Sequence, residues 1–432
     1  MTMNRTTSRD IFNLWWPLAG SWLFMALELP MITFFLSRMA HAKFELAAYG
    51  SVVFPLCLLL ESPIMMILAA STALCKGRDS YFQVWRFMML LSAALTILHF
   101  LAAFTSFYYP LAQQILGVEE SIALHARPAF QYMLPWSWAI GYRRFYQGIL
   151  IRYGKSKAIG WGTLLRIGLN GGILAIGYSF SILGGAGLAG FSTASGVMGE
   201  AIFVRIVVHP YLKELKTRQD SPLSFRGLLH FYIPLALTSL SSLMVMPLTT
   251  VFLSRLPLPV ESLALWPVAM SFFFILRSPA FAYKEVVVAI MERENGYSAL
   301  KRFTLGMAMI SGIVTFAFTL DPIFSFWFTE IIVLTPYLSH FIRLSLVICL
   351  LLPFLTVYIN WLQGLLVFTK NTRPIIESMI LHLLVNILIP SFFLVFPIFP
   401  GVYIAALATI IGNLVQFLWL NRAVIRMGFK EG

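Results

Sequence analysis

The stretch "LLLESPIMM", from Leu58 to Met66, places a carboxylate, Glu61, inside an apolar run. A second stretch, "ILRSPAF" from Ile275 to Phe281, places Arg277 at the equivalent position, at an offset of 216 residues. In both stretches a Ser-Pro pair follows the charged residue. Self-similarity at a fixed offset is the signature of a duplicated architecture, so the extent of the repeat decides the fold.

The repeat extends through most of the chain, in two blocks separated by a one-residue deletion. In the first block, "WPLA" at Trp16–Ala19, Pro30 and "FLSR" at Phe35–Arg38 recur at an offset of 217 as "IPLA", Pro247 and "FLSR". In the second block, Tyr81, Arg86, Phe87, "QGILI" at Gln147–Ile151 and Asn170 recur at an offset of 216 as Tyr297, Arg302, Phe303, "QGLLV" and Asn386. Apolar sequences resemble one another by composition, but shared Pro, Arg, Asn and Gln-Gly positions in register indicate duplication.

The composition is that of a polytopic membrane protein. Of 432 residues, 59% are hydrophobic and 11% are charged, whereas soluble domains carry about a quarter charged residues. At about 20 residues per helical span, the chain has room for about a dozen spans. The start, "MTMNRTTSRD", is short and polar and leads into an apolar segment without a cleavage site, so we expect a retained first span rather than a signal peptide.

Hydropathy predicts twelve spans, at 11–37, 46–72, 82–107, 129–151, 159–180, 186–208, 228–254, 262–290, 303–327, 341–367, 374–396 and 402–421. Basic residues gather in alternate loops. One set of loops and termini holds about 20 of them, and the other set holds about five, which are Arg38, Lys43, Arg127, Arg255 and Arg343. The positive-inside rule therefore predicts that both termini are cytoplasmic, and we expect a bacterial inner (cell) membrane.

The predicted domains are a six-helix bundle over 1–210, a cytoplasmic linker over 211–227 and a second six-helix bundle over 228–432. The linker, "YLKELKTRQDSPLSFR" from Tyr211 to Arg226, is the longest polar stretch. An even number of spans per half makes the repeats parallel, an arrangement found in transporters. The net charge of +13 lies in loops on one side, so a nucleic-acid partner is not expected.

Several classes of chemistry have no support in the sequence. Cys57, Cys75 and Cys349 lie in or beside spans and form no disulfide framework, and the seven histidines do not cluster. We therefore expect no metal and no cofactor. A membrane-embedded transferase or protease needs a nucleophile, base or metal constellation, and none is found, so we do not expect an enzyme. No ATP-binding motif is present, so active transport would use an ion, substrate or voltage gradient.

Two six-span halves in a chain of this size resemble the multidrug/oligosaccharidyl-lipid/polysaccharide (MOP) exporter superfamily, which includes MATE exporters and lipid flippases. Local motifs are similar to those of the progressive ankylosis (Ank) family, whose members export pyrophosphate, nucleotides and citrate. These motifs are "WPLA", "ASTALCKGRDS" after the second span, "GVEES" at Gly117–Ser121, "RPAF" at Arg127–Phe130 and "QGILIRYGKS" at Gln147–Ser156. The chain lacks the long polar C-terminal tail of animal Ank proteins, so it resembles a shorter prokaryotic relative.

The resemblance implies an all-α fold of two V-shaped bundles, with spans 1, 2, 7 and 8 lining a central cleft. Charges inside spans are costly and mark pathways. Glu61 and Arg277 lie at the same depth in spans 2 and 8, and we expect them to pair in one conformational state and separate in another, as a gate or substrate site. The alternatives are a permanent ion pair or two unrelated charges. Pro63 and Pro279 are expected to break helical hydrogen bonding and leave free carbonyls nearby.

Adjacent arginines, Arg143 and Arg144, lie in the inner half of the fourth span. At about 3.6 residues per turn they cannot both face one seam. Guanidinium groups bind phosphate and carboxylate well, so we expect at least one of them to contact an anionic substrate. The alternative is snorkelling to the cytoplasmic interface.

Other polar residues in spans receive weaker assignments. Glu28, and less strongly Glu200, are candidates for binding a coupling proton or Na⁺, although Glu28 could equally pair with an arginine. Arg166 and Arg205 are expected to snorkel to the cytoplasmic surface. Residues near span ends are expected to lie in the interface: Lys284, Glu285, Asp321 and Glu377. The repeat-related pairs Asn170 and Asn386, and Gln147 and Gln363, are expected to make interhelical contacts first and substrate contacts second.

These features predict a secondary transporter that exports a small anionic solute, such as pyrophosphate, a nucleotide or a citrate-like acid, by alternating access. The expected partners are this solute, the lipid bilayer and a coupling H⁺ or Na⁺, and the expected functional form is a monomer. Two alternatives remain open: a flippase for an anionic lipid-linked precursor, and a MATE-like multidrug exporter. The second would favour acids over arginines in its cavity.

Overall fold

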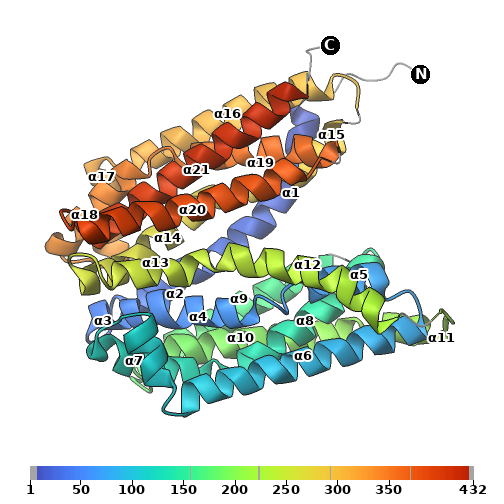
Figure 1. The fold of residues 1–432 in the computed structure, drawn as a ribbon, viewed down its shortest axis with the longest axis horizontal. Coiled ribbons are helices and arrows are strands. Elements are labelled where there is room, and N and C mark those ends of the chain that lie inside the picture. Colours follow the sequence, from blue (N-terminus) through green and yellow to red (C-terminus); the bar gives the residue numbers. More distant parts are fainter. Residues whose placement is uncertain (1–6, 156, 222–223, 292, 370, 428–432) are drawn as a thin grey trace. The chain divides into compact units, whose positions relative to one another are not determined.

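The computed structural model describes residues 7–427 apart from 156, 222–223, 292 and 370, and the described part is helical throughout (Figure 1). Eleven helical segments of this part are long and apolar enough to cross a membrane. A twelfth segment, α8 (Leu134–Arg152), falls short of that apolarity because it carries three arginines, Arg143, Arg144 and Arg152, and two tyrosines. The protein is a multi-pass membrane protein, and the predicted all-α fold of about twelve spans is confirmed.

The helices of the first half follow the predicted spans closely. They are α1 (Ser8–Ala26), α2 (Glu28–Leu36), α3 (Ala42–Ala47), the π-helix η1 (Ala48–Val53), α4 (Phe54–Glu61), α5 (Ile67–Leu74), α6 (Arg78–Phe104), the π-helix η2 (Pro110–Ile115), α7 (Glu120–Tyr132), α8, α9 (Lys157–Ser179), α10 (Gly185–Val207) and α11 (His209–Thr217).

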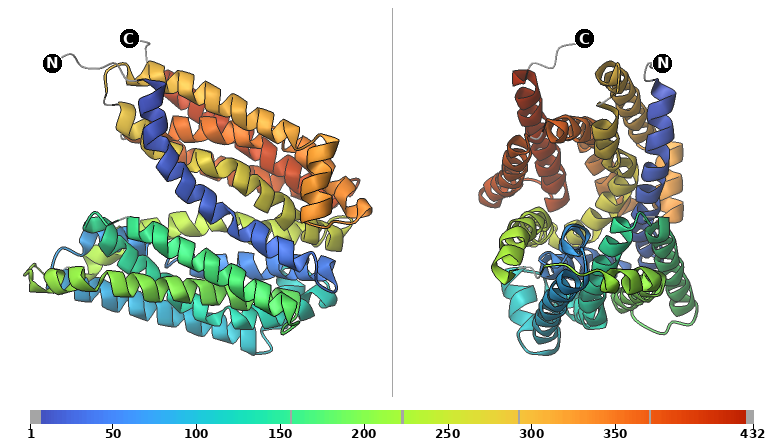
Figure 2. Two further views of the ribbon diagram at one scale, coloured as in Figure 1. Left: turned by 180° about the vertical axis from the view of Figure 1, so that it is seen from behind. Right: turned by 90° about the vertical axis from the view of Figure 1, so that its right-hand side faces the viewer.

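The second half has a similar succession. Its helices are α12 (Phe225–Leu243), α13 (Val245–Leu253), α14 (Pro259–Phe281), α15 (Tyr283–Met291), α16 (Gly296–Ala317), α17 (Asp321–Phe324), the π-helix η3 (Ser325–Ile331), α18 (Pro336–Ile348), α19 (Leu352–Phe368), α20 (Arg373–Val395) and α21 (Gly401–Arg426) (Figures 1 and 2).

The duplication is visible in the packing of glycines at equivalent positions. A Cβ on Gly148 would lie 2.5 Å from the carbonyl oxygen of Leu68, and one on Gly364 would lie 3.1 Å from that of Lys284. Gly148 and Gly364, like Leu68 and Lys284, are related by the offset of 216. Each half thus uses the same glycine to bring two helices into backbone contact, as small residues do in membranes.

The N-termini of α10 and α21 are capped in equivalent ways. The backbone N–H of Ala186 donates to Glu45 Oε2 at 2.6 Å, and that of Val402 donates to Ser262 Oγ at 3.1 Å. Both pairs keep the offsets of the repeat, 216 for the donors and 217 for the acceptors. The acceptors satisfy N–H groups that a helix start leaves unpaired.

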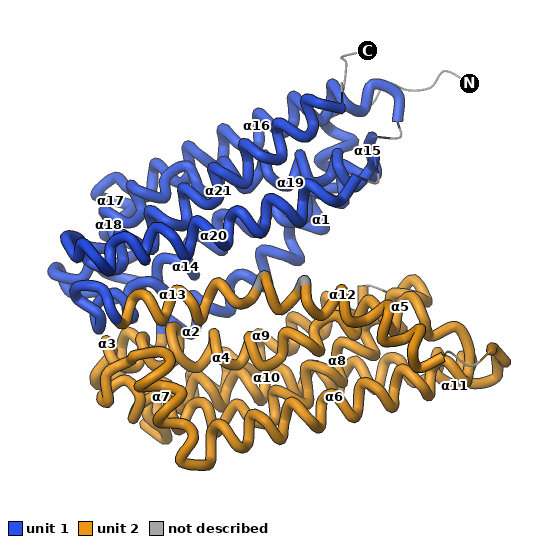
Figure 3. Tube along the Cα trace, viewed as in Figure 1, with its two compact units in different colours: residues 1–34, 255–432 blue, residues 35–254 orange. Residues whose placement is uncertain are grey.

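The chain forms two compact units, which Figure 3 distinguishes by colour. Unit 1 consists of residues 1–34 and 255–432, and unit 2 of residues 35–254. The first helix of each repeat therefore packs with the other repeat: α1 lies on α14, α15 and α16, and α12 lies on α4 and α5. The predicted boundaries at 210 and 228 follow the duplication, whereas the packing units exchange the first helix of each half.

Proline breaks in the second span of each half are compensated locally. Pro63 lies between α4 and α5, and Pro279 lies in the last turn of α14. A proline removes the hydrogen bond to the carbonyl four residues earlier. Here Ser62 Oγ donates to the Leu59 carbonyl at 2.7 Å, and Ser278 Oγ donates to the Ile275 carbonyl at 2.8 Å. The expectation of free carbonyls is therefore wrong at these positions, because the serine of each Ser-Pro pair occupies them.

The carbonyls of the prolines themselves are bound by the first helices. Trp15 Nε1 on α1 donates to the Pro279 carbonyl at 2.9 Å, and the Tyr232 hydroxyl on α12 donates to the Pro63 carbonyl at 2.5 Å. Trp15 and Tyr232 are equivalent residues at the offset of 217. In both units, the exchanged first helix is thus hydrogen-bonded to its new neighbour through a side chain at the same repeat position.

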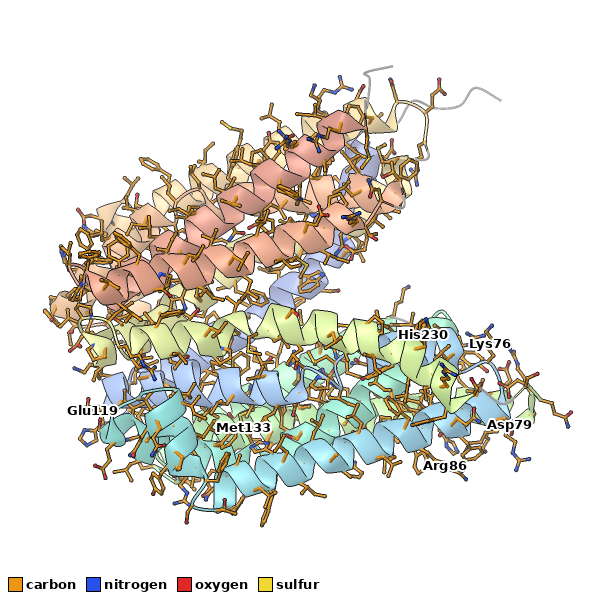
Figure 4. All side chains as sticks on the ribbon, in the orientation of Figure 1. Lys76, Asp79, Arg86, Glu119, Met133 and His230 are labelled. Carbon is orange, nitrogen blue, oxygen red and sulfur yellow. The ribbon has the colours of Figure 1, made fainter. Side chains whose placement is uncertain are left out.

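The segment that joins the repeats is docked on unit 2. After α11, Asp220 Oδ1 accepts the backbone N–H of Asp79 at 2.9 Å, and the Arg218 carbonyl accepts that of Arg78 at 2.9 Å. A Cβ on Gly77 would lie 2.7 Å from the same Arg218 oxygen. Asp220 therefore caps the start of α6, and Figure 4 shows this end of the unit, marked by Asp79, opposite the end marked by Glu119.

Candidate functional site

A buried ionic network joins three helices of unit 2. Glu200 on α10 is fully buried, and its Oε2 accepts a hydrogen bond from Arg143 Nη1 on α8 at 2.5 Å. Gln147, one turn further on α8, donates to Glu200 Oε1 at 2.9 Å. Arg166 Nε on α9 forms an ion pair with Glu200 Oε2 at 3.2 Å. One carboxylate thus holds two arginines and a glutamine.

Glycines allow the helices to approach closely enough for this network. A Cβ on Gly162 of α9 would lie 3.2 Å from Cγ of Glu200, and one on Gly196 of α10 would lie 2.9 Å from the Arg166 carbonyl oxygen. Buried ion pairs need such close geometry, because their attraction must offset the desolvation of both charges.

The expectation that Arg166 snorkels is wrong in this structure, because its guanidinium turns inward to Glu200. Its side chain is 11% exposed. The sequence signal for this contact is a pair of opposite charges, Arg166 and Glu200, in consecutive spans. The position of Arg166 near the end of its span indicates snorkelling instead. Arg205 lies over the Tyr146 ring, 5.3 Å from its centroid, and is half-buried.

Arg144 differs from its neighbour Arg143. It is half-buried, and its Nε makes no hydrogen bond. Within the described part of the chain, no carboxylate forms an ion pair with Arg144. The two adjacent arginines therefore point in different directions, as the helical period requires. Arg143 forms an ion pair with Glu200, and Arg144 does not.

Arg277, in unit 1, also has no carboxylate partner among the described residues. Its Nε donates to Thr356 Oγ1 on α19 at 2.7 Å, and its guanidinium lies 5.6 Å from the centroid of the Phe281 ring. Thr356 in turn donates to the Leu352 carbonyl at 2.8 Å. A neutral hydroxyl and an aromatic face orient this cation without neutralising it.

Glu61 is fully buried in unit 2, and neither of its carboxyl oxygens has a hydrogen-bond partner among the described residues. Its nearby charges are Arg143 and Arg144, and the Ser137 hydroxyl lies beside it. Glu61 and Arg277 belong to different units, so their pairing stays a prediction.

The repeat equivalent of the ionic network is neutral. At the offset of 216, Arg166 becomes His382, Asn170 becomes Asn386, and Glu200 becomes Gln416. His382 Nε2 lies 3.4 Å from Asn386 Nδ2 and 3.3 Å from Asn413 Nδ2. Gln416 Nε2 donates to Ser378 Oγ at 3.4 Å. Unit 2 thus carries charge where unit 1 carries amides and an imidazole.

The remaining candidates are placed as follows. Glu28, on α2, is buried, as are Asn170 and Asn386, and Gln363 on α19 is half-buried. Near span ends, Asp321 pairs with Arg343, and Glu377 accepts from Arg373 Nε at 2.9 Å. No group of three or more His, Cys, Asp or Glu that could hold a metal ion occurs among the described residues.

Comparisons with known proteins give a fold and no sequence family. No family model matches the chain, and no curated protein matches it. An inward-facing MATE multidrug-resistance transporter of the MOP superfamily has a TM-score of 0.72 at 14% identity, covering 98% of this chain and 100% of that one. The fold is that of the MOP superfamily transporters.

Two further structures show the breadth of this fold. The lipid II flippase MurJ, in an inward closed conformation, has a TM-score of 0.69 at 18% identity over 94% of this chain and 87% of that one. A MOP superfamily transporter from Pyrococcus furiosus has a TM-score of 0.64 at 16% identity, over 99% of this chain and 98% of that one, and reverse polarity of its binding pocket is taken to suggest a different function. The fold thus houses sites of different polarity.

Proposed function

We propose that the protein is a secondary transporter that exports a small anionic solute by alternating access. The observation that carries this proposal concerns two guanidinium groups in spans, Arg144 and Arg277, which form no ion pair with a carboxylate among the described residues. An uncompensated buried charge is costly. An anion that arrives from solution would supply the missing charge.

Arg144 and Arg277 are the substrate-binding arginines in this proposal. A guanidinium presents a planar fork of donors that matches phosphate and carboxylate oxygens. Pyrophosphate, a nucleotide or a citrate-like acid carries several such oxygens. Arg143 and Arg166 have a supporting role, because Glu200 already neutralises much of their charge.

Glu200 serves as the counter-ion of this network. Both of its oxygens already accept hydrogen bonds, from Arg143 and Gln147, so we assign it to hold the arginines rather than to bind a coupling ion. Glu28 is retained as a candidate for ion coupling. Asn170, Asn386, Gln147 and Gln363 are assigned to interhelical contacts first.

The competing functions differ in the cargo. An exporter of organic cations would be hindered by uncompensated arginines on its path, so this function is disfavoured. A flippase for an anionic lipid-linked precursor would use the same arginines, and it is the second candidate. The cargo of a flippase carries lipid tails, and the side chains of Arg144 and Arg277 neither favour nor exclude the binding of such tails.

The test is flux in proteoliposomes. Labelled pyrophosphate, ATP and citrate are compared with a cationic dye and a fluorescent anionic lipid, for wild type, Arg144→Ala, Arg277→Ala and the control Arg86→Ala, an exposed arginine on α6. We expect soluble anion flux that falls at least tenfold in the first two variants and persists in Arg86→Ala. Lipid or dye movement without soluble anion flux would overturn the proposal.

A further inference from the structure

A chain of buried polar groups leads away from Glu61 through two other helices of unit 2. Ser137 on α8 and His99 on α6 are both fully buried. His99 Nδ1 lies 2.7 Å from Ser137 Oγ, and His99 Nε2 lies 2.9 Å from the carbonyl oxygen of Phe130. The Ser137 hydroxyl in turn lies beside the Glu61 carboxyl.

The directions of these hydrogen bonds determine which atoms of His99 and Ser137 carry hydrogens. A carbonyl oxygen only accepts, so His99 Nε2 carries a hydrogen. In a neutral imidazole the other nitrogen is then an acceptor, so the Ser137 hydroxyl donates its single hydrogen to His99 Nδ1. Ser137 has no hydrogen left for Glu61, and can only accept from it.

A carboxyl group beside an accepting hydroxyl must supply the hydrogen itself. Glu61 therefore fits this site as a carboxylic acid, whose hydrogen Ser137 Oγ is able to accept. Burial supports the same state, because a fully buried carboxylate without a hydrogen-bond donor is strongly disfavoured. Glu45 is the contrast: its Oε2 accepts the Ala186 N–H at the start of α10.

The other titratable groups around Glu61 do not remove its proton in this arrangement. On α8, Arg143 is bound to Glu200, and neither it nor Arg144 donates to Glu61. On α12, the Tyr232 hydroxyl is used by the Pro63 carbonyl and His230 is exposed. On η1, the Tyr49 hydroxyl pairs with Thr193 at 2.8 Å. Cys57 lies on α4 itself, and α13 has no titratable residue.

We propose that Glu61, Ser137 and His99 form a proton-binding relay, with Glu61 as the carboxyl that carries the proton in this conformation and His99 as its second acceptor. When the proton moves, the Glu61 O–H bond breaks and Ser137 takes that hydrogen. Ser137 passes its own hydrogen to His99 Nδ1. The Nε2–H group of His99 stays hydrogen-bonded to the Phe130 carbonyl oxygen. A neutral pair becomes a carboxylate and an imidazolium, with no net change in charge.

The relay gives the proposed transporter a route for a coupling proton, and this part rests on the proposed function. His99 lies close to the end of α6 at Phe104, away from the end that Asp79 marks (Figure 4). A proton accepted by Glu61 can thus be handed along unit 2 toward that end.

The first test is independent of any substrate. Infrared spectroscopy of the reconstituted protein at neutral pH resolves the carbonyl stretch of a protonated carboxylic acid from carboxylate bands. We expect one such band in wild type, lost in Glu61→Gln, moved in Glu61→Asp and shifted in Ser137→Ala. Glu45→Gln, a buried carboxyl of the same unit, should leave it unchanged. A spectrum in which Glu61→Gln removes no band, or in which Glu61→Asp neither moves nor removes it, would overturn the relay.

The second test addresses coupling. A pH-sensitive dye inside proteoliposomes reports proton movement that accompanies anion flux. We expect Glu61→Gln to abolish this proton movement, and Ser137→Ala to slow it while anion exchange at equal pH persists. If the infrared band behaves as expected but wild type moves no soluble anion, the proposed function fails and the proton site stands. Proton movement unchanged in Glu61→Gln would overturn the role of Glu61 in coupling.

Discussion

Trp15 donates its indole N–H to the carbonyl oxygen of Pro279, which lies 264 positions later in the chain, at 2.9 Å. The equivalent Tyr232 repeats this contact on Pro63 at 2.5 Å. A helix of one repeat is thereby fastened to the proline-broken span of the other, in both units.

Removing either contact should destabilise the protein modestly. Trp15→Phe and Tyr232→Phe each delete one donor of a partly buried hydrogen bond and leave an unpaired carbonyl, at a cost of about 1 kcal/mol. The two sites share no partner, so the double variant should lose about the sum. Thermal unfolding in detergent measures this, with the exposed Tyr337→Phe as control. An unchanged Tm in both single variants would show that these hydrogen bonds are replaced by water or lipid.

Replacing Glu200 should be far more damaging. Glu200→Ala leaves Arg143 and Arg166 buried without their shared carboxylate, and breaking a buried ion pair in this way costs about 3–5 kcal/mol. Thermal unfolding and yield of folded protein report the loss. Glu214→Ala removes an exposed partner of Arg218 and should change stability by less than about 1 kcal/mol. Equal effects of the two substitutions would contradict the assigned role of Glu200.

Glycine substitutions test the packing that the two halves share. Gly148→Ala places a Cβ 2.5 Å from the Leu68 oxygen, whereas Gly172→Ala, on α9, meets no atom within 4 Å. The first should separate α8 from α5 and lower the Tm. The second should be neutral or stabilising, because alanine favours helix over glycine by about 1 kcal/mol. Circular dichroism during heating compares them, and a larger loss in Gly172→Ala would sink the packing argument.

The thiol of Cys75 should be inert in the folded protein. Cys75 lies after α5, outside the predicted spans, and burial raises its pKa to about 12. Thiolate is the reactive form, so maleimide labelling should be slow at neutral pH and should accelerate as pH rises, without reaching a plateau below the pKa. Mass spectrometry after timed labelling measures the rate, with unfolded protein as the reference. Rapid labelling at neutral pH would show that this loop opens.

The expected approach of Glu61 and Arg277 can be tested by cross-linking. In a background where Cys57, Cys75 and Cys349 are replaced by alanine, the pair Glu61→Cys and Arg277→Cys should form a disulfide under mild oxidation. Bridged Cα atoms lie about 4.4–6.8 Å apart, so a bond requires close approach. Protease cleavage in the 211–227 segment followed by gel analysis detects it. If no cross-link forms under any substrate or pH condition, the gate hypothesis is wrong.

Sequence patterns were sufficient for the spans and for the duplication. The apolar runs are long, and shared residues such as Pro63 and Pro279 keep their register, so helix positions follow from hydropathy and from the offset alone. The split of Arg143 from Arg144 could also be expected, because the helical period separates adjacent side chains.

Partner choice could not be predicted in the same way. The inward turn of Arg166 depends on the rotation of α9 against α10, which Gly162 and Gly196 set through contacts that hydropathy does not report. The pairing of Ser137 with His99 could not be predicted, because each is a single polar residue in a different span. The sequence does carry one signal for this network: the offset of 216 relates Arg166 and Glu200 to His382 and Gln416, which are also polar residues in spans.

The exchange of first helices has a consequence for biosynthesis. Helix α1 is complete at Ala26, but α14, on which it packs, begins only at Pro259. At about 5–20 residues per second, ribosomes need on the order of tens of seconds to make the intervening chain. During that time α1 resides in the bilayer without its partner, exposed to the insertion machinery and to membrane proteases. The first half of this protein therefore cannot mature before the second is translated.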